Sequence, residues 1–80
     1  MTRNQCNVYL AGILTTLADM GANVPKSPIY LAMGMNIDDY LTIERVMTGA
    51  ELVTATTETL TLTDKGMDMV RKIRAVIPGV

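Results

Sequence analysis

With one cysteine and no histidine, this sequence lacks the residues for an intrachain disulfide, a zinc site or a histidine-based catalytic triad. A chain of 80 residues buries only roughly 60–65% of its unfolded surface. Its apolar core must therefore hold the fold without a cross-link. Hydrophobic residues make up 49% of the sequence, which favours an ordered structure. We expect one domain over residues 1–80.

The charge balance excludes two classes of protein. Seven basic and eight acidic residues give a net charge of −1, which fits neither a strongly basic nucleic-acid coat nor an acidic solvating tail. No apolar run approaches the about 18 residues that a membrane span needs. The N-terminal residues lack the pattern of a signal peptide. The single Cys6 fits a reducing compartment, so we expect a cytoplasmic protein in which this thiol is inert and partly buried, the alternative being a reactive thiol.

Residues 5–20 are expected to form a first helix that ends at Gly21, a residue type typical of helix C-termini. A loop over residues 21–26 should follow. The apolar residues of the helix recur every three or four positions, which places them on one face. They are Leu10, Ile13, Leu14, Leu17 and Met20.

A second, short helix is expected to begin with Ser27 as its N-cap and Pro28 in the first helical position, and to end at Gly34. A third helix should extend from a cap at Asn36 to Thr48. Asp38 and Asp39 in its first turn favour the positive end of the helix dipole. Its apolar arc comprises Tyr40, Ile43, Val46 and Met47.

Residues 52–56 and 59–62 are rich in β-branched side chains and predict a hairpin, although neither residue of the connecting Thr57-Glu58 pair favours positive φ. Thr63 should cap a last helix over residues 64–77. The apolar face of that helix comprises Met69, Val70, Ile73, Val76 and Ile77, and Pro78 and Gly79 follow it. The expected fold is mainly α with a small β-hairpin, in the order α-α-α-β-β-α.

This order, with the short helix and turn of residues 27–34 and the string Leu62-Thr63-Asp64-Lys65-Gly66, resembles the winged helix-turn-helix family. In that family an "LT-x-x-G" string is frequent where the second hairpin strand meets the last helix. The resemblance covers residues 5–77. It implies that the third helix enters the DNA major groove and that the hairpin lies against the backbone or the minor groove.

The resemblance also assigns candidate DNA contacts. Asp38, Thr42 and Arg45 would point at base edges, and Lys26 and Ser27 would lie beside a phosphate at the start of the second helix. The hairpin tip would approach the duplex with its threonines. The candidate set is Lys26, Ser27, Asn36, Asp38, Thr42, Arg45 and Thr57.

The charges depart from that pattern. Residues 25–62 hold two basic and five acidic residues, a net charge of −3, whereas residues 63–80 hold four basic and two acidic residues, a net charge of +2. Because phosphate neutralisation supplies essentially all non-specific affinity, the first segment should repel a duplex. A phosphate patch at Arg71, Lys72 and Arg74 is one alternative, and a solvated basic helix end is the other.

Other residues allow two interpretations each. Arg45 would contact a guanine or form a surface ion pair with Asp38 or Glu44. The two aspartates would cap their helix, accept a hydrogen bond from cytosine or meet a basic partner. The seven methionines would fill the core or form an adaptable docking surface. Met35 and Met67 are the ones that we expect to be exposed.

No motif for catalysis, for a cofactor or for a metal is present, so an enzyme is the least expected class. The first hypothesis is a DNA-binding transcriptional regulator that forms a homodimer through its first and last helices. The second is a protein-interaction module of the same shape, with an acidic face that docks a basic protein.

Overall fold

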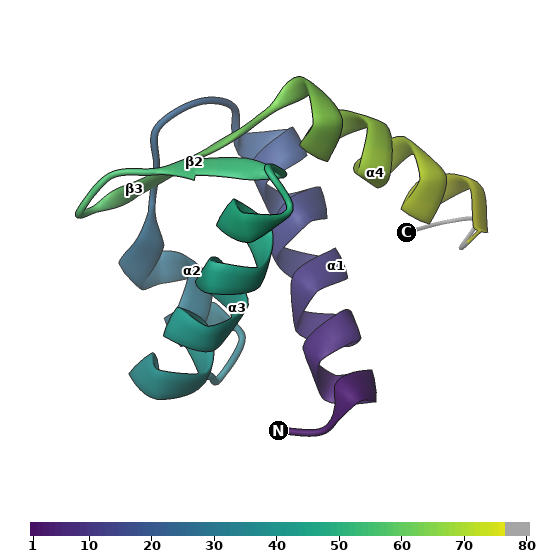
Figure 1. Ribbon diagram of the computed structural model, residues 1–80. Helices are drawn as coiled ribbons and strands as arrows, with labels where there is room; N and C mark the ends of the chain where they lie inside the picture. Colours follow the sequence, from purple (N-terminus) through teal and green to yellow (C-terminus); the bar gives the residue numbers. More distant parts are fainter. Residues whose placement is uncertain (77–80) are drawn as a thin grey trace.

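A computed structural model describes residues 1–76, which form four helices and a small antiparallel sheet of three strands (Figure 1). The fold is mainly helical, as the sequence predicts. The helix α1 crosses the middle of the molecule, with α2 and α3 on one side and α4 on the other. The elements are α1 (Arg3–Met20), β1 (Val24–Pro25), α2 (Lys26–Ala32), α3 (Ile37–Gly49), β2 (Val53–Ala55), β3 (Thr59–Leu62) and α4 (Asp64–Val76).

The strand β1 corrects the expectation of a loop over residues 21–26, so the expected order of elements was incomplete. Val24 pairs with Leu60 and Pro25 with Thr59, which places β3 between β1 and β2. A strand of two residues is too short to show an alternating pattern in the sequence. It forms because β3 offers an unpaired edge and because Val24 is buried there.

The helix caps are confirmed at two sites and wrong at one. The side chain of Asn36 accepts a hydrogen bond of 2.8 Å from the backbone N–H of Asp39, and the Thr63 hydroxyl accepts one of 3.0 Å from that of Gly66. Ser27, by contrast, lies inside α2, which begins at Lys26 without a side-chain cap. The backbone N–H of Lys26 bonds to the Glu58 carbonyl across the sheet, so strand pairing sets this helix start.

The core lies where α1, α3 and the sheet meet, and it contains most of the residues predicted on helical faces. Four predicted positions are corrected, and the first is Met20, which was expected on the apolar face of α1 but is exposed. Val46, expected in the apolar arc of α3, is exposed, whereas Met35, expected to be exposed, is buried and Met67 is half-buried. Gly34 adopts a φ of 67° and turns the chain inward just before Met35. The buried residues are Ile13, Leu14, Leu17, Val24, Ile29, Met35, Tyr40, Ile43, Met47, Leu52, Val53, Leu60 and Val70.

The helix α4 packs on α1 and β3 mainly along its first half, and in its second half Ile73 is half-buried against the core and Arg74 pairs with Asp19 of α1. Gly66 and Val70 are its buried residues, whereas Met69 and Val76 of its predicted apolar face are exposed. The expectations for Ile77, Pro78 and Gly79 lie outside the described residues. None of the helices in residues 1–76 combines the length and the apolar composition that crossing a bilayer requires.

Candidate functional site

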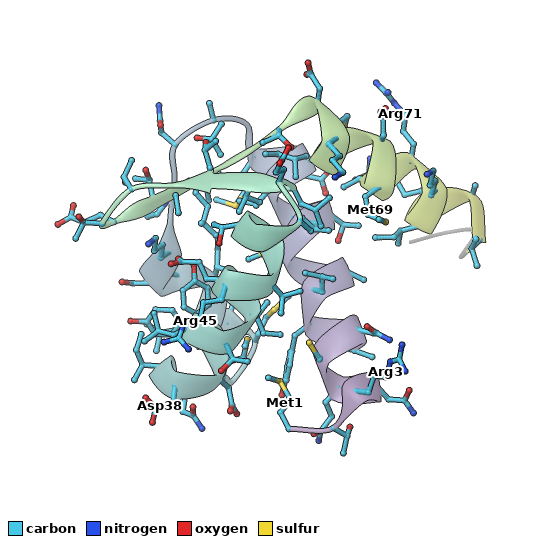
Figure 2. All side chains as sticks on the ribbon, in the orientation of Figure 1. Met1, Arg3, Asp38, Arg45, Met69 and Arg71 are labelled. Carbon is cyan, nitrogen blue, oxygen red and sulfur yellow. The ribbon has the colours of Figure 1, made fainter. Side chains whose placement is uncertain are left out.

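The outer face of α3 carries three of the residues that the sequence assigns to DNA bases. Asp38, Thr42 and Arg45 are all exposed, and Figure 2 shows Asp38 and Arg45 on the side of α3 that faces away from α4. The Thr42 hydroxyl donates a 3.1 Å hydrogen bond to the Asp38 carbonyl. The opposite face of the helix is fixed in the core by Tyr40, which leaves this outer face free to meet a partner.

Lys26 lies at the start of α2, as the resemblance implies, and its side chain is engaged within the chain. Its ammonium forms a 2.8 Å ion pair with Glu44 of α3, and the two side chains are only 14% and 18% exposed. The Tyr40 hydroxyl donates a 3.0 Å hydrogen bond to the same carboxylate oxygen of Glu44. Burial, strengthened by this hydrogen bond and by the negative charge of Glu44, raises the pKa of Tyr40 well above its ordinary value. The network joins α2 to α3.

A shallow groove of about 330 Å³ brings together three candidate residues, two from α2 and one from the hairpin. Lys26 and Ser27 line it from α2, and Thr57 lines it from the hairpin tip. The structure thus places the start of α2 beside the hairpin. Exposed Ile37 and Leu41 of α3 line the same groove. The side chain of Asn36 is engaged in the cap of α3, so it serves the helix start.

The hairpin turn is held by hydroxyl groups. The Thr56 hydroxyl accepts hydrogen bonds from the backbone N–H groups of Glu58 and Thr59, at 3.3 and 3.0 Å, and lies 2.7 Å from the Thr59 hydroxyl. Neither Thr57 nor Glu58 adopts a positive φ. These local bonds replace the usual turn residues. The tip therefore presents a threonine and a glutamate, with no cation.

The basic residues of α4 do not join this surface. Arg71 pairs with Asp68 at 2.9 Å, and Arg74 pairs with Asp19 of α1 at 2.8 Å. Figure 2 shows Arg71 on the opposite side of the molecule from Arg45. Lys72 lies between α1 and α4. The expected phosphate patch therefore consists of two arginines in ion pairs and one lysine that lines the groove between α1 and α4.

The surface of α3 and the hairpin is acidic, with one cation outside an ion pair. Residues 25–62 carry a net charge of −3, and Glu44 neutralises Lys26. Within this segment Arg45 forms no ion pair, either with Asp38 or with Glu44, so its guanidinium is available to a ligand. Asp38, Glu51 and Glu58 of the same segment are exposed.

Sequence reasoning missed three features of this surface. The spacing of Tyr40 and Glu44 at i and i+4 is a signal that they meet on one helix face. The contact of Lys26 with Glu44 has no such signal, because tertiary packing creates it. Leu41 was also missed, as an exposed apolar residue beside the groove.

Within residues 1–76 no cluster of three metal-ligating side chains is present. Comparisons with family models, with curated proteins and with solved structures give no match for this chain.

Proposed function

We propose that this chain is a small winged-helix DNA-binding protein, a transcriptional regulator in which α3 enters the major groove and the β2–β3 hairpin flanks it. The observation that carries the proposal is Arg45, a cation on the outer face of α3 that forms no ion pair within residues 1–76. Thr42 lies one turn before it on the same face. The helix pair α2–α3 and the three-stranded sheet are the parts that such a domain requires.

Five of the seven candidate residues take roles that fit their positions. The Arg45 guanidinium donates two hydrogen bonds to a guanine edge, and the Thr42 hydroxyl contacts a neighbouring base. Ser27 and Thr57, on either side of the groove, donate to phosphates. Lys26 acts as a positioning residue, because its pair with Glu44 fixes α2 against α3.

The acidic surroundings make the expected binding weak and sequence-dependent. A face with one free cation releases few counterions, so it gains little non-specific affinity. Discrimination then comes from the bidentate contact of Arg45, which is worth about 1–3 kcal/mol.

A fluorescence anisotropy titration of random-sequence and site-selected duplexes at low salt tests this proposal. We expect binding that Arg45→Ala weakens, with relaxed preference at one base position. The matched control is Arg3→Ala, which removes an exposed cation from α1 on another side of the molecule and should leave the preference intact. The absence of binding up to about 100 µM protein, the weak limit of ordinary non-specific association, would contradict the proposal.

A second candidate function, a module that docks a basic protein, is favoured by the acidic charge of the same face. Exposed Asp38 and Glu58 lie where a partner's lysines or arginines would gain complementary charge. A co-purified complex that survives nuclease, and that is lost in the double variant Asp38→Lys and Asp39→Lys, would support it. A complex unaffected by these changes would count against it.

A further inference from the structure

Three apolar side chains are exposed on α3, in addition to Arg45. Ile37 is 49% exposed, Leu41 40% and Val46 43%. All three lie outside the core cluster formed within residues 1–76, so they do not help to hold the helix in place. An apolar side chain that meets only water gains nothing there, whereas one that meets an apolar group of a ligand is removed from water. We therefore asked which of the three a ligand of Arg45 would reach.

Helix geometry singles out Leu41. Successive residues of an α-helix advance by about 100° around the axis and by about 1.5 Å along it. Leu41 precedes Arg45 by four residues, so it lies about 40° from Arg45 around the helix and about 6 Å from it along the axis. Ile37 is turned about 80° away from Arg45, and Val46 about 100°. Of the exposed apolar side chains of α3, Leu41 therefore points most nearly in the direction of Arg45.

The side chain of Leu41 is also partly fixed in the free protein. It lines the shallow groove between α3 and the hairpin tip, together with Ile37, Tyr40 and Thr57. Because Leu41 is only 40% exposed, the chain already covers more than half of its surface. A side chain held in this way loses little conformational freedom when a ligand arrives, so more of the contact energy appears as affinity.

Building on the proposed function, we propose that Leu41 contacts the C5 methyl group of a thymine, one or two base pairs from the guanine that Arg45 binds. The thymine methyl is the apolar group that a base displays in the major groove, and apolar side chains are its usual partners. Base pairs follow one another at about 3.4 Å, so the about 6 Å between Leu41 and Arg45 along α3 spans one or two of them. The preferred DNA site then contains a thymine close to a guanine.

The charge of this surface makes an apolar contact valuable. Residues 25–62 carry a net charge of −3, and Asp38 and Glu58 are exposed, so phosphate contacts add little affinity. The contact between Leu41 and a methyl group releases no counterions. Its contribution is therefore the same at low and at moderate salt, whereas the contribution of phosphate contacts falls as salt is added.

Replacement of thymine by deoxyuridine tests the contact, because it removes only the C5 methyl group and keeps the base pair. Each thymine of the site-selected duplex is replaced in turn, and the dissociation constants are measured by fluorescence anisotropy. We expect one replacement to weaken binding of the natural chain about fourfold, which corresponds to the about 0.8 kcal/mol of one buried methyl-sized group. The ratio should be the same at about 50 and 200 mM salt.

Leu41→Ala should bind the thymine and deoxyuridine duplexes equally, because it lacks the side chain that meets the methyl group. The matched control is Leu31→Ala, since Leu31 is an exposed leucine of α2 outside the groove lining. It should keep the fourfold ratio, and circular dichroism should show both variants folded.

Two results would overturn the role of Leu41 and leave the proposed function standing. One is binding that depends on Arg45 but shows no effect of deoxyuridine at any position. The other is an effect of deoxyuridine that Leu41→Ala leaves unchanged. A chain that binds none of the duplexes would overturn both proposals, so the two failures are distinguishable.

Discussion

At Gly66 the absence of a side chain decides how closely α4 meets the rest of the molecule. A Cβ atom at this position would overlap the backbone carbonyl oxygen of Leu52 and the side chain of Leu62. The carbonyl of Leu52 also accepts the backbone N–H of Thr63, so it cannot move without breaking the junction between the sheet and α4.

Gly66→Ala should therefore destabilise the fold by about 1–3 kcal/mol, the usual cost of forcing extra atoms into a packed site. The matched control is Gly49→Ala at the end of α3, where a Cβ meets open space. That change should be neutral or stabilising by up to about 1 kcal/mol. Urea unfolding followed by circular dichroism measures both. Equal effects of the two substitutions would show that the contact with Leu52 does not constrain the junction.

Tyr40 couples the stability of the fold to alkaline pH. Its pKa is raised in the native state by burial and by Glu44, whereas in the unfolded chain it titrates near about 10. Above that pH the native state keeps a proton that the unfolded state loses. The native state then binds more protons, so the free energy of unfolding falls as the pH rises through this window.

Tyr40→Phe should reduce that fall by up to about 1.4 kcal/mol per pH unit, the value for one proton. At neutral pH it should destabilise the chain by about 1.5 kcal/mol, since it removes a hydrogen bond to a charged group. The control is Tyr9→Phe, because the hydroxyl of Tyr9 has no hydrogen bond within the described part of the chain. Unfolding measured from pH 9 to 11.5 checks the slope. A slope equal in the natural and Tyr40→Phe chains would contradict the assignment.

At the scale of the elements, the two helices of the candidate surface begin in different ways. The helix α3 starts with a side-chain cap, because Asn36 accepts the backbone N–H of Asp39. The helix α2 starts where β1 ends, and Ser27 makes no capping bond there. The first start is local in the sequence, whereas the second depends on pairing with β3.

Asn36→Ala should therefore cost about 0.5–2 kcal/mol in unfolding free energy, the usual range for a lost N-cap. Ser27→Ala should stay within about 0.5 kcal/mol of the natural chain, as substitutions without such a role do. Thermal and urea unfolding of the two variants check the difference. A larger loss for Ser27→Ala would mean that this serine caps α2 in solution.

At the scale of the whole molecule, charge is segregated along the chain. Residues 25–62 carry −3 and residues 63–80 carry +2, and Figure 2 shows that Asp38 and Arg71 lie on opposite sides. If the outer face of α3 meets DNA, as we propose, then the acidic side chains on that face limit the affinity for the duplex.

Asp38→Asn should strengthen binding to a duplex at low salt, because it removes a repulsive charge from that face. Asp64→Asn is the matched control. It removes an exposed acid from the first turn of α4, changes the net charge equally, and should change the affinity little. Anisotropy titrations at two salt concentrations measure both. Equal gains would indicate that total charge, and not the face of α3, controls binding.

Much of the fold could be predicted from local patterns. The caps at Asn36 and Thr63 and the buried spacing of Ile13, Leu14 and Leu17 follow from short-range chemistry and are confirmed. The candidate surface was only partly predictable. Arg45 and Thr42 are exposed, as helical periodicity indicates. The ion pair between Lys26 and Glu44 could not be predicted, because it joins residues 18 positions apart in the sequence.

The sequence by itself determined the four helices, the hairpin and the acidic balance of residues 25–62. Periodicity, capping and charge depend on residues a few positions apart, so they can be read without coordinates. Only the tertiary structure decided that β1 pairs with β3, that Met35 is buried and that α1 and α4 leave an apolar groove between them. These features depend on contacts between distant segments, whose packing no local pattern encodes.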